Sequence, residues 1–185
     1  MADPFTLVHD AIWDCLEAYS GFTDLVAESN RIDNTGSSRA PNKDIANSAD
    51  YPWVRILPLG ADDPDLRDTS DEGKVTRSYV IQIVTDTVVP GGTDWLGTIY
   101  NVEWNCFKAL LDWRSYWGPS SSLTIEGEDG EDYNFVTCFS FGSVDQGVTN
   151  PTAAEQNKEG VGGWVTVMTL VFNMSFPRAA FIPQA

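Results

Sequence analysis

Two short segments of this sequence concentrate carboxylate side chains, which can bind divalent cations or repel other anions. The segment from Gly60 to Lys74 (GADDPDLRDTSDEGK) carries six of them: Asp62, Asp63, Asp65, Asp68, Asp71 and Glu72. The segment EGEDGED carries five more: Glu126, Glu128, Asp129, Glu131 and Asp132. Calcium takes several oxygen ligands, so each segment is a candidate metal site, a solvated loop, or a surface that repels an anionic partner.

Neither segment has the spacing of a calcium-binding loop. Such a loop places alternate oxygen ligands over about twelve residues, with a central glycine and a terminal glutamate, and neither acidic segment follows that register. The cysteines Cys15, Cys106 and Cys138 are too widely spaced for a zinc pattern or a disulfide framework. We therefore expect no metal and no cofactor, and we expect three reduced thiols that pack as small buried hydrophobes.

The sequence offers little for catalysis. Its single histidine, His9, lies beside Val8 and Asp10, and no nucleophile stands at a recognisable spacing from it. We expect a half-exposed helix residue. The glycine-rich stretch PGGTDWLG lacks the lysine and the spacing of a phosphate-binding loop. The prediction is that the protein is not an enzyme, with a small enzyme of unknown type as an alternative.

Seven tryptophans raise a second alternative, a carbohydrate-binding module whose exposed rings stack on sugars. Most of them lie in or beside predicted helices and strands, where they are better placed as core or interface anchors. Such stacking modules are also usually all-β, whereas this chain has two clear helical patterns.

The predicted helices have apolar residues at helical spacing. In the first, Asp3 is the expected cap, Pro4 occupies the first turn, and the apolar positions are Phe5, Val8, Ile12, Leu16 and Tyr19. In the second, which follows Thr93, they are Leu96, Ile99, Tyr100, Phe107, Leu110 and Leu111.

The predicted strands surround the acidic segments. Strands over 53–57 and 75–87 flank the first segment, so we expect a hairpin with a long acidic tip. Asp129-Gly130 predicts a turn between two further strands. The last strand places one set of side chains on a single face at period two: Trp164, Met168, Leu170, Phe172, Met174 and Phe176.

This order of elements predicts one α+β domain over residues 1–185. We expect a single antiparallel or mixed sheet with two helices packed on one face and long loops. The long loops are 34–50 and 147–163, and residues 177–185 are a candidate C-terminal arm. A sheet covered on one face leaves edges that neighbouring copies can join, which favours a subunit of a ring.

The net charge limits the partners. With 27 acidic and 11 basic residues the formal charge is −16, which argues against binding DNA or RNA through phosphate contacts. The opening sequence MADPFTLVHD has neither the basic region nor the apolar run of a signal peptide. No stretch approaches the roughly 20 apolar residues of a membrane span, so we expect no membrane contact.

In order and pattern, the chain resembles the tail terminator proteins of long-tailed phages and the related neck and tail-completion proteins. The resemblance rests on the opening helix LVHDAIWDCLEAYSGFTDLV, the strands WVRILPLG and SYVIQIVTDT, the helix LGTIYNVEWNCFKALLDW and the closing strand GWVTVMTLVFNMSF. It implies a ring, commonly a hexamer, that caps the tail tube and joins it to the head-side connector or stopper. It also implies a place in the virion tail or neck after assembly in the host cytoplasm, and no catalytic residues.

The resemblance gives the acidic segments a role, because DNA must pass through such a ring without binding. Carboxylates repel phosphates over a Debye length of about 8–10 Å, so we expect the acidic residues of one or both segments, 62–72 and 126–132, to face the lumen. A solvated outer surface is the alternative. Trp164, Phe176 and Phe181 are the expected subunit-interface residues. A head–tail adaptor or stopper and a tail-tube subunit remain open as other roles.

Overall fold

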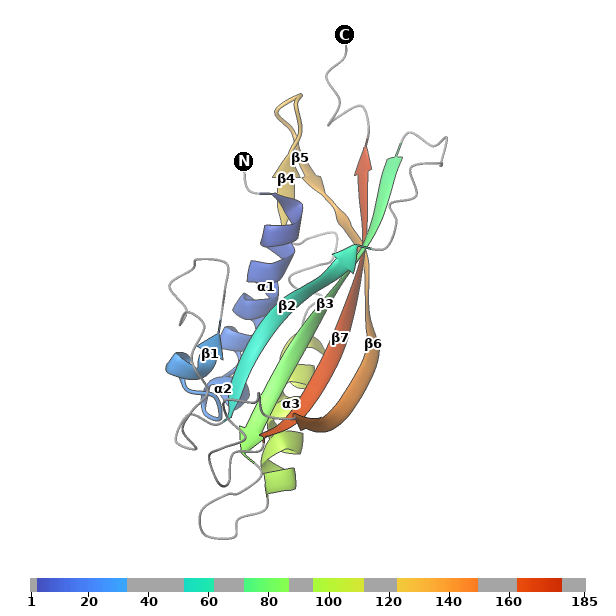
Figure 1. Cartoon of the computed structure of the whole chain (residues 1–185). Coiled ribbons are helices and arrows are strands. Elements are labelled where there is room, and N and C mark those ends of the chain that lie inside the picture. Colours follow the sequence, from blue (N-terminus) through green and yellow to red (C-terminus); the bar gives the residue numbers. More distant parts are fainter. Residues whose placement is uncertain are drawn as a thin grey trace.

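The computed structural model describes residues 3–32, 52–61, 72–86, 95–111, 123–149 and 163–177. They form an α+β fold whose main sheet has the strand order β1-β2-β3-β7-β6 (Figure 1). The strands are β1 (Arg31–Ile32), β2 (Trp53–Ala61), β3 (Glu72–Asp86), β6 (Val136–Thr149) and β7 (Gly163–Pro177). Only β1 and β2 are parallel among these pairs, so the sheet is mixed, as the sequence predicts.

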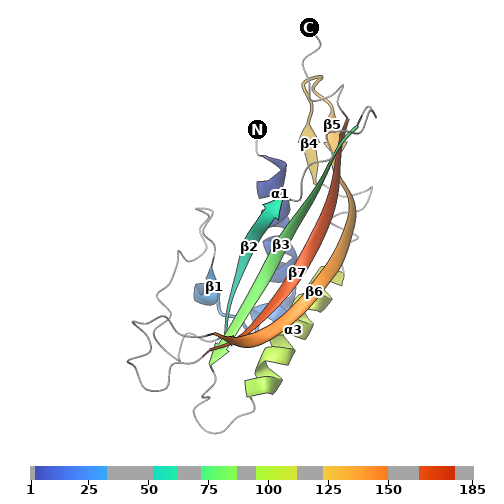
Figure 2. The same cartoon turned by 45° about the vertical axis from the view of Figure 1, so that its right-hand side comes forward.

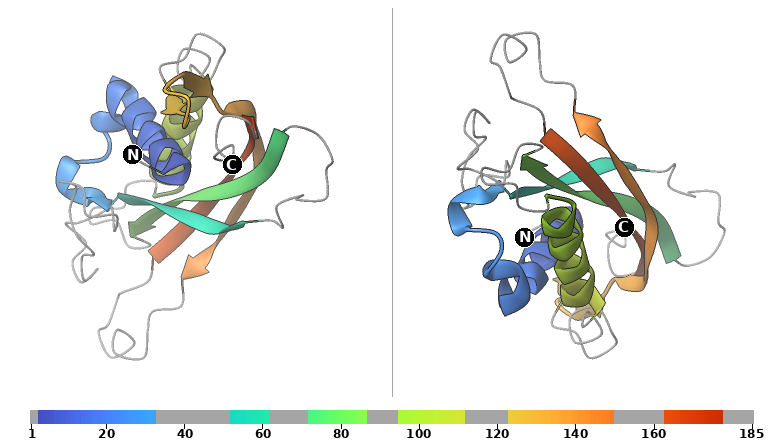
Figure 3. Two further views of the ribbon diagram at one scale, coloured as in Figure 1. Left: turned by 90° about the horizontal axis from the view of Figure 1, so that it is seen from above. Right: turned by 90° about the horizontal axis from the view of Figure 1, so that it is seen from below.

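The helices are α1 (Pro4–Ala18), the short α2 (Ser20–Thr23) and α3 (Trp95–Leu111), with a 3₁₀ turn over Glu28–Asn30. Figure 3 shows α1 and α3 on the same face of the main sheet. The Asp3 side chain accepts hydrogen bonds from the backbone N–H groups of Phe5 and Thr6, both at 3.0 Å, which confirms the predicted cap. Val8, Ile12 and Leu16 recur every four residues and are fully buried.

The core lies between these helices and the inner face of the sheet. Strand β7 shows how the sequence builds it, because Met168, Leu170, Phe172 and Met174 alternate with less buried residues and are themselves at most 1% exposed. Opposite them on β3 are Ile81 and Tyr79, paired with Met168 and Leu170. The predicted period-two face of β7 is confirmed from Met168 to Met174.

A close approach joins α2 to α3. A Cβ atom at Gly21 would lie 2.5 Å from the Asn105 side-chain oxygen and 2.6 Å from the ring of Tyr19. Because real Cβ atoms do not come so near, only glycine fits between these elements without a shift. The side chain of Asn105 is itself buried and donates to the Asn101 backbone oxygen at 2.7 Å.

Three details differ from the sequence predictions. The segment from 132 to 149 contains two strands, because β5 (Asp132–Asn134) pairs with β4 (Thr124–Glu126) in a small separate sheet, and β6 starts afterwards. Residues 147–149, expected in a long loop, extend β6 and pair with Val165, Trp164 and Gly163 of β7. Pro177, expected in a C-terminal arm, is the last residue of β7. Residues 34–50 and 178–185 lie outside the described part of the chain.

Single residues also depart from expectation. His9 is only 4% exposed, and its ring lies 6.5 Å from that of Tyr79. Cys15 and Cys106 are buried, as expected, but Cys138 is exposed. Tyr100 and Leu111, expected in the core, are 49% and 50% exposed on α3. The predicted positions Ile99 and Leu110 are buried, and they are joined by Val102, Cys106 and Ala109.

Candidate functional site

The β4–β5 hairpin carries the second acidic segment and projects from one end of the molecule (Figure 2). All five of its acidic side chains, at 126, 128, 129, 131 and 132, are exposed. The turn is closed by two backbone bonds, Gly127 N–H to Glu131 O at 2.8 Å and Gly130 N–H to Gly127 O at 3.0 Å. Gly130 has a φ of 80°, the left-handed conformation that glycine adopts readily. The predicted Asp129-Gly130 turn is confirmed.

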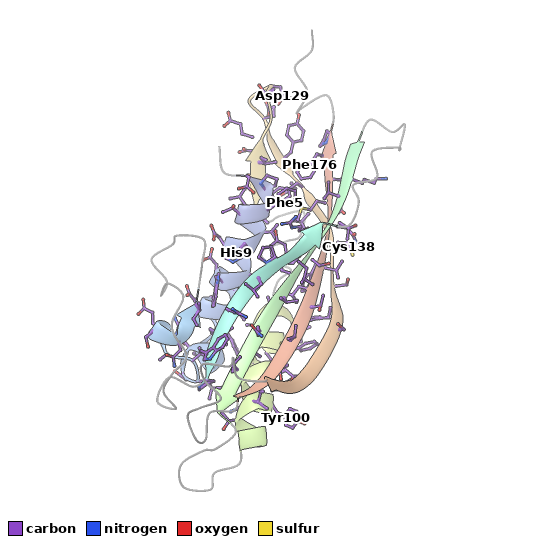
Figure 4. The ribbon with its side chains drawn as sticks, viewed as in Figure 1. Phe5, His9, Tyr100, Asp129, Cys138 and Phe176 are labelled. Atoms are coloured by element: carbon purple, nitrogen blue, oxygen red, sulfur yellow. The ribbon has the colours of Figure 1, made fainter. Side chains whose placement is uncertain are left out.

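Asp129 organises the tip of this hairpin (Figure 4). Its carboxylate accepts a hydrogen bond from the Tyr133 hydroxyl at 2.7 Å and another from the Glu131 N–H at 3.2 Å. These bonds favour the charged carboxylate, so the pKa of Asp129 is lowered, mainly by Tyr133, and the pKa of Tyr133 is raised by the same bond. The hairpin therefore holds its negative charge in a defined shape.

The base of the hairpin is fixed to the end of β7. Ile125 and Phe135 are 8% and 0% exposed. The Ser175 N–H donates to the Phe135 carbonyl at 2.8 Å, and the rings of Phe135 and Phe176 stack with centroids 5.7 Å apart. The apolar base thus holds an acidic tip that would otherwise be a marginally stable isolated hairpin.

Strand β3, which follows the first acidic segment, begins at the same end of the molecule. Glu72 is the first residue of β3 and pairs with Pro177, next to the Phe176 that stacks on Phe135. Residues 62–71, which carry Asp62, Asp63, Asp65, Asp68 and Asp71, lie outside the described part of the chain. The strands on either side of them, β2 and β3, pair as the predicted antiparallel hairpin. The sequence identifies both segments by composition, but only the strand register shows that β3, which follows the first segment, begins near the base of the hairpin.

The expected interface residues have different surroundings. Phe176 is half-buried against Phe135 of its own chain. Trp164 lies in β7, paired with Thr85 on one side and Val148 on the other. Phe181 lies outside the described residues. Nothing in these positions tests the interface prediction.

Sequence patterns miss a second exposed surface, formed by α3 and β6. Trp104 is 55% exposed and its ring stacks on Phe107 with centroids 5.7 Å apart. Phe107 in turn stacks on Phe141 of β6 at 4.4 Å. Tyr100, Leu111 and Val144 add exposed apolar groups on the same two elements. We call this set, Tyr100, Trp104, Phe107, Leu111, Phe141 and Val144, the α3–β6 surface.

Among the residues that the structure describes, no group of three or more His, Cys, Asp or Glu side chains is placed to hold a metal ion. No helix in the same ranges is long and apolar enough to cross a membrane. Burial raises the pKa of the Cys106 thiol well above its ordinary value, with Glu103 adding to the shift, so this cysteine stays protonated and unreactive at neutral pH.

Comparison with known proteins gives a structural match. The sequence matches no protein-family model and no curated protein. A chain from a solved structure described as "Virion of native gene transfer agent (GTA) particle" matches with a TM-score of 0.51 and 12% sequence identity. The match covers 89% of this chain and 92% of that chain. At this identity it shows that the two chains share a fold, along almost the whole of both.

Proposed function

We propose that this chain is a structural subunit of a phage-like virion rather than an enzyme. The observation that carries the proposal is the likeness of fold, over nearly the full length of both chains, to a chain of a gene transfer agent virion. More narrowly, the proposed role is that of a tail terminator. It would form a ring, most simply a hexamer, that caps the tail tube and joins it to the head-side connector in the neck.

The free edges of the sheet support a ring. In the described part of the chain β6 pairs only with β7, so one side of this 14-residue strand is open. On the opposite edge, and again within the described ranges, β1 covers only Val54 and Arg55 of β2. Two open edges on opposite sides allow a head-to-tail contact in which each copy uses both, and such contacts form rings when the rotation closes.

The α3–β6 surface supports the same arrangement. It places several half-exposed apolar side chains directly beside the open edge of β6, where a neighbouring copy would cover them. Lys108 lies over the rings of Trp104 and Tyr19, at 5.8 and 5.4 Å, which leaves a cation at the margin of the surface. Trp164, Phe176 and Phe181 remain proposed interface residues.

The acidic hairpin supports the proposal that DNA passes through the lumen of the ring. We assign the hairpin carboxylates, together with those of 62–72, to the lumen of the ring, where they would repel the phosphates of passing DNA. The hairpin suits this role because its charge is held on a fixed turn anchored by Phe135.

Light scattering after size exclusion tests the proposal, first with the protein alone and then with purified tail tubes, followed by negative-stain imaging. We expect closed rings, or binding confined to one end of each tube. Trp104→Ser is expected to weaken assembly, whereas Ala18→Ser, at an exposed position of α1, is the control and should assemble normally. Binding all along the tube or growth of filaments would instead indicate a tube subunit. A monomer that ignores tubes would contradict the proposal.

A further inference from the structure

A cavity of about 260 Å³ opens between the first turns of α1 and the inner face of β2 and β3. It lies at the end of the sheet near the N-terminus of α1, and Figure 4 shows Phe5 and His9 on this helix beside the sheet. Its volume is below the roughly 300–1,000 Å³ of pockets that hold drug-sized ligands. Any ligand it takes is therefore small, or is one side chain of a larger partner.

The walls of the cavity are mostly apolar and are held in place. Phe5 from α1, Pro58 from β2 and Tyr79 from β3 contribute the larger surfaces. The Tyr79 hydroxyl donates to the Phe5 carbonyl at 2.8 Å, which ties the helix to the strand. The Tyr79 hydroxyl proton is therefore already in a hydrogen bond. Burial also raises the pKa of Tyr79 well above its ordinary value. Tyr79 therefore shapes the cavity as a neutral group.

The positive charge in the lining comes from Arg77. Its guanidinium lies over the Phe5 ring, 5.0 Å from the centroid. The Arg77 Nε is buried and makes no hydrogen bond. The rest of the Arg77 side chain interacts with the Tyr79 hydroxyl, through its charge and a hydrogen bond, and this partly offsets the rise that burial causes in the pKa of Tyr79. A buried donor without an acceptor costs free energy, so a ligand that brings an acceptor to this guanidinium would recover that cost.

The negative charge in the lining limits what this ligand can be. Asp3 also lines the cavity, but its oxygens already accept bonds from the Phe5 and Thr6 N–H groups and from the Thr6 hydroxyl, the last at 2.6 Å. Thr6 holds the pKa of Asp3 below its ordinary value, so Asp3 is charged at neutral pH. One arginine beside one aspartate, on a chain of formal charge −16, favours a singly charged anion over a phosphate dianion.

We propose that this cavity is a binding site for a carboxylate attached to a small apolar group. The carboxylate accepts hydrogen bonds from the Arg77 guanidinium, whose planar shape matches the two oxygens of a carboxylate. The apolar part of the ligand packs on Phe5 and Pro58. The same chemistry could come from a free organic acid or from a Glu or Asp side chain of a neighbouring polypeptide. The site does not depend on the role in a tail.

Benzoate is the probe, titrated into the full-length protein at physiological salt and followed by the NMR signal of the Arg77 side-chain Nε–H. We expect saturable binding that shifts this signal, and at least tenfold weaker binding of benzamide, the neutral analogue. Inorganic phosphate should also bind more weakly than benzoate. These comparisons use the unmodified protein, so they stand even if a variant fails to fold.

Variants then test whether Arg77 binds the carboxylate. Arg77→Met should weaken benzoate binding at least tenfold, and Arg77→Lys should weaken it less. The matched control is Arg55→Gln: Arg55 donates to Gln82 from the other face of the same sheet, and its loss should leave binding unchanged. Equal binding of benzamide, tighter binding of phosphate, or unchanged binding to Arg77→Met would overturn the proposal.

A capped Ala-Glu-Ala peptide distinguishes the source of the carboxylate. Tighter binding of this peptide than of benzoate would support a neighbouring polypeptide as the natural partner. Tighter binding of benzoate would support a free organic acid.

Discussion

Single residues depart from their sequence predictions where distant neighbours decide burial. His9 follows the helical pattern of a boundary position, yet Tyr79, seventy residues later, packs its ring against it. Cys138 is exposed because the pairing register shifts between Val136 and Cys138, which places Cys138 opposite Asn173. The next residue, Phe139, pairs with Phe172 and is buried. The cavity was unpredictable for the same reason, since residues of α1, β2 and β3 build it together.

At the same scale, Tyr133→Phe tests the hairpin tip. Without the hydroxyl that donates to Asp129, the pKa of Asp129 should rise towards its ordinary value. Because the folded pKa is the lower one, this bond stabilises the turn above the ordinary aspartate pKa, and the contribution is lost as pH falls through the folded pKa. A carboxyl ¹³C NMR titration measures the shift. Tyr100→Phe, at an exposed tyrosine of α3, serves as the control. An unaltered Asp129 pKa in Tyr133→Phe would contradict the assignment.

Whole elements were more predictable than single residues. Period-two alternation identifies the inner face of β7, and helical spacing identifies the core face of α1, because each pattern is local to one element. The extension of β6 through Gly147, Val148 and Thr149 was missed because these residues have the composition of a loop, and they become a strand only through pairing with β7. Composition identifies the acidic segments, whereas the nearness of the start of β3 to the hairpin base follows from pairings between distant strands.

The two faces of β7 can be compared by mutation. Phe172 is fully buried and meets Tyr79 edge to face with centroids 5.6 Å apart. Phe172→Ala should lower the free energy of unfolding by about 3–5 kcal/mol, since it leaves a cavity in the core. Val171 is half-buried on the opposite face, and Val171→Ala should cost about 1 kcal/mol. Urea unfolding measures both. Equal losses would mean that the outer face is packed as tightly as the core.

The molecule as a whole combines open sheet edges, an apolar surface beside one edge and an acidic end. Separately, each is common in soluble domains. Together they fit a subunit that contacts copies of itself at its sides and presents charge along one end. The likeness to a virion chain concerns the fold that carries these features, and it spans 89% of the residues.

Charge neutralisation tests the whole-molecule assignment in assembled particles. Glu128→Gln with Glu131→Gln removes two exposed carboxylates from the hairpin, and we expect slower release of DNA. Asp24→Asn with Glu28→Gln removes two exposed carboxylates near α2, towards the opposite end of the sheet (Figure 1), and should leave release unchanged. The difference should shrink as salt rises, because screening shortens the range of repulsion. If both pairs behave alike, the hairpin does not face the DNA.

The position of β7 also constrains how the chain folds. It follows every other described strand in sequence, yet it lies between β3 and β6, and Thr76 of β3 bonds Asn173 of β7 across 97 residues. Such distant pairings must overcome a large loop-closure entropy before they contribute stability, and they slow folding. Until β7 arrives, the long edges of β3 and β6 stay unpaired on a growing polypeptide. A chain truncated before residue 163 would therefore expose two strands with unpaired edges and should aggregate.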